Sequence, residues 1–509
     1  MIIPVVLTLV AIPIVLYAII KYIEYNARRS IINIHTKKPI DNMVGLIPSF
    51  GMFLSKQHTS FGRYETTKEF NYKPFLSFLG TNVLLNVSQP ELAKKVLLNW
   101  RLYEKMKPDV TPDLKRVTGH SVVFANGEDW KAQRQIMNPA FFNVDRFANQ
   151  FSIVTKECLR VMSEMLKTEE TLPIPSLMTA LTLDILGVTT FGHDFNYLRE
   201  ACLPPSKIPS ESALNIKAYE YVMTNMVTVS KILLQGSYKS LAKKESIEFD
   251  SSLKRLEDLM SSMIQKSRLR SKNQVVEENY TETLLDMMVA ANDSDEGSKM
   301  DDALLRDNAL VIFIAGHDTT SNTLCYALYS LCKYPETQTK LLQEIKDKVG
   351  MKSEPTVEQI DGMDYLNMFI KENLRLNGPL DNIPPKTLNE DAVLGDYQLK
   401  KGVSVAINSY AIHRNKQIWG QDAEEFRPER FSEAESKGRH SNAYIPFSAG
   451  PRTCMGNRFS LLEQKIFLVS LLQKFELSLP DQDYVCKPQS GDVMYFAARD
   501  LRLTFKKRE

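Results

Sequence analysis

Cysteine is scarce in this sequence, and several motifs that would define a function are missing. The 509 residues include six cysteines with no C-x-x-C pair, which argues against a disulfide scaffold and is typical of a reducing compartment. The net charge of +2 comes without a long basic run or zinc-finger spacing, so no nucleic-acid binding is expected. No G-x-G-x-x-G dinucleotide motif or flavin site is present, so redox chemistry would depend on electrons from a separate partner.

An uncharged apolar stretch opens the chain. Residues 2–20 carry no charge, and about 20 apolar residues span a bilayer core as a helix. Lys21, Arg28 and Arg29 follow, and the positive-inside rule then places the rest of the chain on the cytoplasmic side. A cleaved signal peptide would need basic residues before the run and a small-residue cleavage site after it, and neither is present. We expect a single-pass anchor at 1–21, a linker at 22–60 and one folded domain at 61–509.

The remaining sequence predicts a mainly helical domain. Helical patterns dominate residues 129–375, whereas short β-rich runs lie at 61–87 and after 375. The mostly apolar segment 301–334 carries internal charges, which favour a buried central helix over a second membrane span. A further helix is expected at 455–475. The order of elements, without alternating strand–helix units, predicts an α+β fold, mainly α, with small sheets in a single large domain.

Cys454 lies in the short sequence FSAGPRTCMG, residues 447–456. Zinc and iron–sulfur clusters need several cysteines at close spacing, and Cys454 has none nearby. A catalytic nucleophile would need a histidine partner, such as His413 or His440. A buried structural cysteine in a chance turn is a further alternative. A single axial thiolate to haem iron needs no second cysteine.

The residues around Cys454 suit a haem thiolate. Gly450 and Gly456 let backbone N–H groups approach the sulfur, Phe447 shields it from water, and Arg452 can pair with a propionate. The resulting pattern, F-x-x-G-x-R-x-C-x-G, resembles the haem-binding loop of the cytochrome P450 monooxygenases. The resemblance implies haem b with the Cys454 thiolate as its axial metal ligand, in a fold that covers nearly the whole chain from about residue 60.

The sequence AGHDTTSNT begins at Ala315 inside the long apolar segment. Ala315 and Thr319 are four residues apart and share one helical face. The sequence resembles the oxygen-activating helix of the family, which implies that Thr319 and Asp318 are catalytic and deliver protons. The alternative for Thr319 is a hydrogen bond back to a carbonyl one turn earlier. His317 occupies a variable position of the family and is expected to be structural or on the surface.

Three charged residues are predicted to form a structural network. Glu372 and Arg375 are three apart on one helical face, and Arg430 lies in the later sequence FRPERF. By resemblance they form the buried E-x-x-R plus arginine cluster of the family. Because buried charges persist only when fully paired, loss of one member is expected to prevent haem incorporation.

Three further residues are expected at the haem propionates. Trp130 and Arg134 match the W-x-x-x-R motif with which the family holds a propionate, and a surface cation–π pair is the alternative. Family members often place a propionate-binding arginine after the E-x-x-R pair. This chain has Lys386 there, which offers one point charge instead of a guanidinium fork.

The family resemblance also places the substrate pocket. Residues 105–125 are expected to form a lid over it. The expected lining is mostly apolar, which suits a lipophilic substrate. It comprises Val311, Ile312, Ala315, Leu380, Asn382, Ile383, Val493 and Met494.

The chain is identified by this resemblance as a haem-thiolate monooxygenase that inserts one oxygen atom of O2 into a C–H bond. A steroid is the first expected substrate, and fatty acids and terpenoids are the alternatives. An NADPH–cytochrome P450 reductase, with cytochrome b5 as a further partner, is expected to supply electrons at the endoplasmic reticulum membrane. A peroxide isomerase or dehydratase of the same fold often lacks the acid–threonine pair, so Asp318 and Thr319 argue against it. A non-catalytic membrane haem sensor is the alternative from another class.

Overall fold

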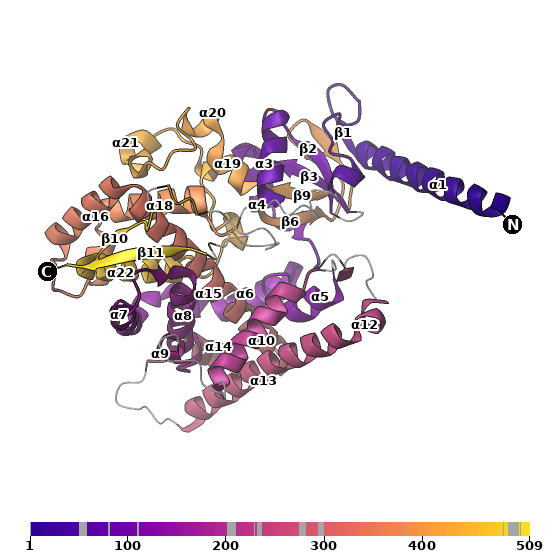
Figure 1. The fold of residues 1–509 in the computed structure, drawn as a ribbon. Helices are drawn as coiled ribbons and strands as arrows, with labels where there is room; N and C mark the ends of the chain where they lie inside the picture. The colour runs from indigo at the N-terminus through magenta and orange to yellow at the C-terminus, as the bar shows by residue number, and fades with distance from the viewer. Residues whose placement is uncertain are drawn as a thin grey trace. The chain divides into compact units, whose positions relative to one another are not determined.

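A computed structural model of the chain describes residues 2–49, 59–79, 82–108, 111–200, 210–228, 230–231, 237–273, 281–293, 300–380, 382–481, 483–486, 498 and 500–508 (Figure 1). The predicted pocket residues Val493 and Met494 lie outside the described residues. The chain forms two compact units. The sheet unit comprises Met1–Lys107, Asp381–Ala423 and His440–Thr453, and the helical unit comprises Pro108–Leu380, Glu424–Arg439 and Cys454–Glu509.

A five-stranded sheet organises the sheet unit. Its strand order is β2 (Phe75–Leu79), β3 (Asn82–Val87), β9 (Ser404–Ile407), β6 (Ile383–Leu388) and β4 (Tyr103–Lys105). The β3–β9 pair is parallel, and the other pairs are antiparallel. The register of β6 shifts between Ile383 and Lys386, where Pro384 and Pro385 have no N–H to donate. Buried Leu76, Leu85 and Val405 belong to the apolar core of this unit.

A long helix leads into this unit from the N-terminus. Helix α1 (Ile2–Arg29) projects from it in Figure 1 and is followed by β1 (Ile31–Asn33). Strand β1 pairs with β8 (Tyr397–Leu399), which pairs with β7 (Ala392–Leu394). The helix therefore runs past residue 21, and part of the segment expected as a linker is a strand of a small sheet.

The helical unit is built around α15 (Asp302–Lys333). Asp301 caps this helix by accepting a hydrogen bond of 2.7 Å from the N–H of Leu304, and most residues from 305 to 332 are buried. The helix packs along α8 (Ile174–Leu186), which continues into a π-helical turn at Gly187–Phe191. The other long helices of this unit are α6 (Gly127–Phe142), α7 (Ala148–Met165), α10 (Glu211–Asn225), α13 (Lys243–Asn273), α14 (Leu284–Asp293), α16 (Pro335–Lys348), α18 (Asp364–Asn377) and α22 (Asn457–Lys474).

Shorter elements complete the two units. The helical unit contains α5 (Pro112–Thr118), α9 (Tyr197–Glu200), α12 (Tyr238–Leu241), α17 (Val357–Asp361), α21 (Glu433–Ser436) and a sheet in the order β10 (Phe475–Ser478), β11 (Arg502–Lys507) and β5 (Leu172–Pro173). The sheet unit contains α3 (Thr59–Glu69), α4 (Pro90–Leu98), α19 (Ser409–Arg414) and α20 (Lys416–Trp419). The predicted fold class, α+β and mainly α with small sheets, is confirmed.

One local prediction was wrong. Residues 61–69 were expected to belong to a small sheet, but they form most of α3. Tyr64 and Thr67 are three residues apart on one face of this helix and are both buried, and the Tyr64 ring packs edge-on against Tyr410 at 5.4 Å. The packing of this face stabilises helix in a segment with weak sequence periodicity.

A single segment within the described residues is long and apolar enough to cross a membrane as a helix. It is Ile174–Phe191, formed by α8 and the turn that follows, and 78% of it is buried inside the protein. This burial identifies it as a core helix. The described residues exclude the side chains of the first half of α1.

Candidate active site

The Cys454 thiol differs from the other described cysteines in its exposure. Cys158, Cys325 and Cys332 are buried and Cys486 is half-buried, but Cys454 is exposed. Burial raises the pKa of the Cys325 thiol well above its usual range, so that sulfur is an inert core group. The exposure of Cys454 contradicts the alternative of a buried structural cysteine.

A tight loop precedes the thiol. Ser448 and Gly450 have φ values of +63° and +72°, and Thr453 donates hydrogen bonds to the carbonyls of Gly450 and Phe447 at 3.0 and 3.2 Å. A Cβ on Gly450 would lie 2.7 Å from the Leu97 carbonyl oxygen, so both conformation and space require glycine there. The close approach that Gly450 permits in this structure is thus to the backbone of α4.

The remaining motif residues Phe447, Arg452 and Gly456 differ in burial and in how far their predicted roles are visible. Arg452 is buried, and Phe447 is half-buried. Gly456 has an ordinary φ of −82°, and a Cβ there would meet nothing within 4 Å. Its predicted role in admitting the backbone to the sulfur therefore stays a prediction. It is the N-cap residue of α22, so the positive end of that helix dipole begins two residues after Cys454.

Arg134 is close enough to Cys454 for the two charges to interact. Trp130 and Arg134 both lie on α6, four residues apart, with Trp130 buried and Arg134 half-buried. Burial lowers the pKa of Arg134, and the charge of the Cys454 thiolate partly offsets this shift. A guanidinium held beside a thiolate stabilises the deprotonated sulfur that a metal requires.

Lys386 is a buried cation in the sheet unit. It lies on β6, is 1% exposed, and its Nζ has no hydrogen-bond partner among the described residues. Burial, and then the charge of Arg452, lower the pKa of Lys386 to about 8. Because an isolated buried ammonium is costly, this pair of neighbouring cations is suited to binding an anion.

Helix α15 presents a small, accessible face near its middle. Val311 and Ile312 are buried, but Ala315 is exposed although it lies between buried turns of a core helix. Thr319 Oγ1 donates a hydrogen bond of 2.9 Å to the Ala315 carbonyl, which is the back-bonding predicted as the alternative. The Asp318 carboxylate accepts a hydrogen bond from the hydroxyl of Tyr219 on α10. Sequence reasoning missed Tyr219, which lies 99 positions away and carries no motif.

The structure brings Glu372, Arg375 and Arg430 together in a fully buried cluster. Arg375 donates to both Glu372 oxygens at 2.7 and 2.8 Å, and Arg430 Nε donates to Glu372 Oε1 at 2.9 Å. The backbone N–H of Arg427 donates to the same oxygen at 2.8 Å. These hydrogen bonds saturate the carboxylate, as a buried charge requires.

Comparison with known proteins gives a family for the chain. The family model described as Cytochrome P450 matches residues 43–505. Cytochrome P450 709B1 of Arabidopsis thaliana is 31% identical over 423 residues, and the alignment covers 80% of this chain and 77% of the plant protein. A cytokinin hydroxylase of the same organism is 29% identical over 412 residues, covering 80% and 76%. The crystal structure of the cytochrome P450DA heme domain matches with a TM-score of 0.77 at 21% identity, covering 91% of this chain and 95% of that one.

The chain belongs to the cytochrome P450 family.

Membership in the cytochrome P450 family gives the cofactor and the reaction class. Its members are haem monooxygenases that hold haem b through a cysteine thiolate, take electrons from a redox partner and use O2 on lipophilic substrates. In the helical unit, Cys454 offers an accessible thiol that interacts with the charge of Arg134, as a haem thiolate requires. In the sheet unit, buried Lys386 and Arg452 form a cationic pair that suits an anionic group such as a propionate. No three His, Cys, Asp or Glu side chains of the described part of the chain gather as a metal site of another kind.

A cysteine hydrolase would need a histidine with a free lone pair on a ring nitrogen as its general base, and neither His413 nor His440 offers one. His413 Nε2 accepts a hydrogen bond of 2.9 Å from the N–H of Ile445, and His413 is buried. His440 Nδ1 accepts a hydrogen bond of 3.0 Å from the N–H of Asn442. In each imidazole the lone pair that would take a proton from a thiol is engaged by the backbone.

The remaining predicted pocket residues are divided between the two units. Val311, Ile312, Ala315 and Leu380 belong to the helical unit, and Leu380 is 37% exposed. Asn382 and Ile383 belong to the sheet unit, with Asn382 half-buried and Ile383 buried at the start of β6. Their assignment to the pocket stays a prediction.

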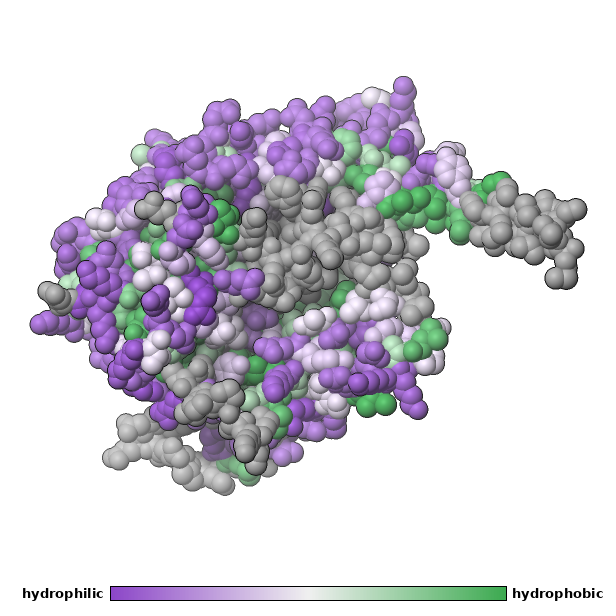
Figure 2. Space-filling model, viewed as in Figure 1, coloured by the Kyte–Doolittle hydropathy of each residue, from purple (hydrophilic) through white to green (hydrophobic). Residues whose placement is uncertain are grey.

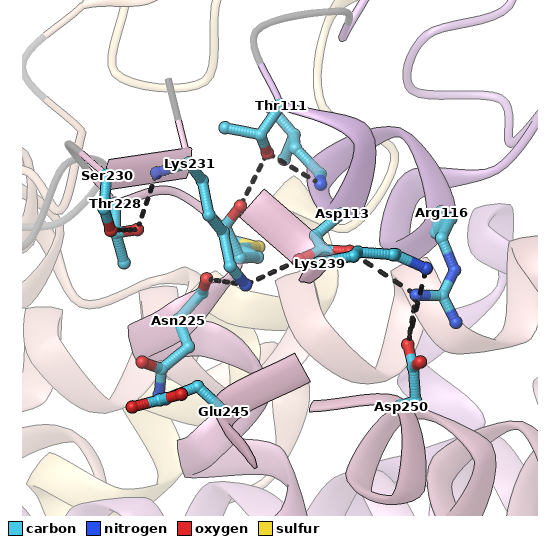
Figure 3. A network of polar contacts seen from close by, with 12 residues as sticks. Thr111, Asp113, Arg116, Asn225, Thr228, Ser230, Lys231, Lys239, Glu245 and Asp250 are labelled. Carbon is cyan, nitrogen blue, oxygen red and sulfur yellow. Dashed lines mark hydrogen bonds and ion pairs between the residues drawn. The ribbon is translucent and has the colours of Figure 1, made fainter. Parts of the chain in front are cut away.

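The helical part of the predicted lid is tied down by a charge network that sequence reasoning missed (Figure 3). Lys231 is 3% exposed, and its Nζ lies 2.5 Å from Asp113 Oδ2 on α5 and donates to the Asn225 carbonyl at 2.6 Å. Arg116 continues the network from Asp113, at 3.4 Å, to Asp250 on α13, at 2.5 Å. The Thr111 hydroxyl, which caps α5, donates to the Met226 carbonyl at 2.6 Å. No local spacing signals the contacts of Lys231 with Asp113, of Arg116 with Asp250 and of Thr111 with Met226, because each joins segments more than 100 residues apart.

Proposed function

We propose that this chain is a membrane-anchored haem-thiolate monooxygenase that hydroxylates a lipophilic substrate, with a steroid as the first candidate. The observation that carries the proposal is the exposed Cys454 thiol at the end of a glycine-dependent loop and beside Arg134. An accessible thiolate stabilised by a guanidinium is the protein half of a haem-thiolate bond.

Haem b, when bound through Cys454, supplies activation of O2, and the protein supplies orientation, charge and protons. We assign Phe447, Gly450 and Gly456 to shielding and shaping the surroundings of the Cys454 sulfur. Arg452, Lys386, Trp130 and Arg134 are assigned to the two propionates. Lys386 is the most informative of these, because its buried ammonium lacks a partner among the described residues.

Proton delivery is assigned to Asp318 and Thr319. Thr319 Oγ1 donates to the Ala315 carbonyl, so its oxygen lone pairs stay available to accept a hydrogen bond on the accessible face of α15. The Asp318 side chain is 23% exposed, which leaves the carboxyl within reach of that face as a source of protons. Removal of either group should leave haem binding intact and divert reducing equivalents to peroxide.

An apolar stripe supports a lipophilic substrate. Val311, Ile312 and Ala315 follow one another on α15, and Leu380 of the same unit is an exposed aliphatic side chain; Ile383 of the sheet unit stays assigned to the pocket by resemblance alone. A rigid apolar body such as a steroid nucleus suits these side chains, and fatty acids and terpenoids are the alternatives. Two relatives are named as cytokinin hydroxylases, so a cytokinin is included as a further candidate.

The N-terminal helix supports attachment to the endoplasmic reticulum membrane. The side chains of residues 14–19 of α1 are exposed, including Ile14 at 61% and Leu16 at 53%, and Figure 2 shows this part of the helix in green. Lys21, Arg28 and Arg29 follow on the same helix, as expected at a cytoplasmic boundary. We propose an anchor at 1–21, a linker at 22–60 and a catalytic domain at 61–509, with an NADPH–cytochrome P450 reductase and cytochrome b5 as electron donors.

The spectrum of the reduced, carbon-monoxide-bound protein tests the ligand. A strongly red-shifted Soret band is expected for the wild type, and Cys454→Ser should lose that band. Cys486→Ser is the matched control, because Cys486 is half-buried outside the loop, and this variant should keep the band. An ordinary Soret band in the wild type would contradict thiolate ligation.

A binding screen followed by product analysis tests the substrate. Steroids, fatty acids, terpenes and cytokinins are added to the ferric protein, and those that shift its Soret band are incubated with NADPH and reductase. A hydroxylated steroid is the expected product. Turnover of a fatty acid, terpene or cytokinin without turnover of any steroid would replace the first candidate.

A further inference from the structure

The Asp318 carboxyl is held by two aromatic residues. Its Oδ2 accepts a hydrogen bond from the Tyr219 hydroxyl, and its Oδ1 lies 3.3 Å from Nε2 of His317. His317 was expected to be structural or on the surface, and it is completely buried. The Tyr219 hydroxyl therefore fixes Oδ2, whereas the buried Nε2 of His317 lies close to Oδ1 and has no hydrogen-bond partner among the described residues.

The hydrogen-bond chemistry of His317 locates one proton. Its Nδ1 lies 2.7 Å from the Phe313 carbonyl oxygen, and since a carbonyl can only accept, Nδ1 carries a hydrogen. In a neutral ring Nε2 then presents a lone pair toward Asp318 Oδ1. Two lone pairs at 3.3 Å repel, so the contact is stable only when one of the two atoms holds a proton. The complete burial of His317 leaves no solvent to replace this contact.

Aromatic packing prevents these two side chains from turning away. The Tyr219 ring lies 4.6 Å from the His317 ring and meets Phe313 edge-on at 5.6 Å and 88°. The Phe313 ring lies 5.4 Å from the His317 ring, so the three rings pack mutually against one another. Tyr219 is 5% exposed, so its hydroxyl has one direction in which to donate.

We propose that Tyr219 and His317 are positioning residues for proton delivery by Asp318. Tyr219 fixes Oδ2 through its hydroxyl, and His317 lies beside Oδ1, where a proton on either atom forms a hydrogen bond once the two groups align, so that Asp318 stays oriented for each turnover. The inference rests on the proposed monooxygenase function. Neither residue touches the reacting atoms, and both act through the carboxyl.

The first test compares two tyrosines on the same helix. Tyr219→Phe removes only the hydroxyl that binds Asp318, whereas Tyr221→Phe removes a half-exposed hydroxyl that points to the Glu245 carbonyl at 3.4 Å. In the holoenzyme with reductase and substrate, Tyr219→Phe should raise peroxide released per product by about tenfold, the effect typical of removing an outer partner of a reacting group. It should keep the red-shifted Soret band and the thermal midpoint, and Tyr221→Phe should resemble the wild type throughout.

A double variant separates positioning from general destabilisation. Asp318→Asn should uncouple NADPH use to at least the same extent, and Tyr219→Phe added to it should cause no further change. Multiplying effects in the double variant would overturn the proposal, as would equal peroxide release in Tyr219→Phe and Tyr221→Phe.

Two substitutions of His317 test its proton. The amide of His317→Gln extends to the region of Nε2 and can donate to Asp318, whereas that of His317→Asn reaches only the region of Nδ1. Coupling of NADPH use to product should be retained in His317→Gln and lost in His317→Asn.

Nitrogen-15 spectra of histidine-labelled, reduced, carbon-monoxide-bound holoenzyme give a readout without turnover, and the His317 Nδ1 signal should be that of a protonated nitrogen. An unprotonated Nδ1, or equal coupling in the two variants, would overturn the role of His317. If the wild type lacks the red-shifted band, the proposed function fails; if the wild type has the band and forms product while the variants match it, this inference alone fails.

Discussion

Two charge clusters of the helical unit bury ions in different ways. Glu372, Arg375 and Arg430 are 0–1% exposed, and the Glu372 carboxylate is saturated by side-chain and backbone donors. In the charge network at α5, Lys231 and Asp113 are buried at one end, but Arg116 and Asp250 at the other end have side chains that are 39% and 46% exposed. All three residues of the first cluster are shielded from water, whereas side-chain exposure in the second rises from the buried Lys231–Asp113 pair to the half-exposed Arg116–Asp250 pair.

This difference suits two mechanical roles. Opening the Glu372 cluster would expose several ions at once to an apolar interior, so its elements stay together in the folded state. The Asp113–Lys231 pair can be released stepwise, because Arg116 and Asp250 already contact water and can be rehydrated at small cost. A segment expected to admit substrate needs attachment of the second kind.

The largest effect is expected for Glu372→Gln. This change leaves Arg375 and Arg430 buried beside a neutral amide, and breaking such a cluster costs about 3–5 kcal/mol of unfolding free energy. Haem content of the purified protein and the urea midpoint of unfolding measure the loss. Glu435→Gln is the control, since its ion pair with Arg427 is 37–41% exposed and is worth about 0–1 kcal/mol. If Glu372→Gln kept its haem and its stability, the fully buried cluster would be no more important for folding than the partly exposed network.

A smaller loss is expected for Lys231→Met, at about 3 kcal/mol, because Asp113 keeps its contact with Arg116. The methionine side chain retains the packing against the Phe249 ring, whose centroid lies 4.0 Å from Lys231 Nζ. The effect should be local, so amide hydrogen exchange should accelerate in α5 while the core of α15 stays protected. The double variant Lys231→Met with Asp113→Leu should regain stability. Uniform acceleration across both helices would show that this network, too, supports the whole unit.

Lys386 extends the comparison to a buried charge of the sheet unit. Its folded-state pKa of about 8 lies below its ordinary value of 10.5, so between these pH values the unfolded chain binds the extra proton. The stability of the haem-free protein should therefore rise as the pH increases from about 8 toward 10.5, by on the order of 2 kcal/mol. Urea unfolding across this pH range measures the effect, and Lys386→Met should abolish it. A decrease in stability over the same range in the wild type, absent in Lys386→Met, would mean that Lys386 has an anionic partner.

The smallest effect is expected for Arg116→Gln, at about 0–1 kcal/mol, because its ion pair with Asp250 is half-exposed. Added salt should reduce the difference between variant and wild type further, whereas it should leave the Glu372→Gln loss unchanged. Thermal unfolding at low and high ionic strength measures both. If Arg116→Gln lowered the unfolding free energy as much as Lys231→Met does, the exposed and buried ion pairs of the network would contribute equally to stability.

Sequence alone determined the features that local covalent geometry fixes. The spacing of Glu372 and Arg375 places both on one helical turn in any fold, and the cluster is present. In the loop 447–456 the sequence itself signals the backbone conformation, because Gly450 occupies a position with positive φ that favours glycine. The long helix of 301–334 was predicted within a residue at each end, because its capping aspartate and apolar length are local signals. By contrast, residues 61–69 were assigned to a sheet together with the β-rich runs that follow them, and they form a helix.

Only the tertiary structure decided what lies opposite each of these residues. Nothing in the sequence near Asp318 indicates that Tyr219 binds it, that Lys231 pairs with Asp113, or that Lys386 is buried without a partner among the described residues. These contacts join segments separated by many turns and strands, and their energies depend on burial that a residue acquires only when the chain packs. The family motifs are therefore specified by short stretches of sequence, whereas the direction of the Asp318 carboxyl and the attachment of α5 are specified by packing.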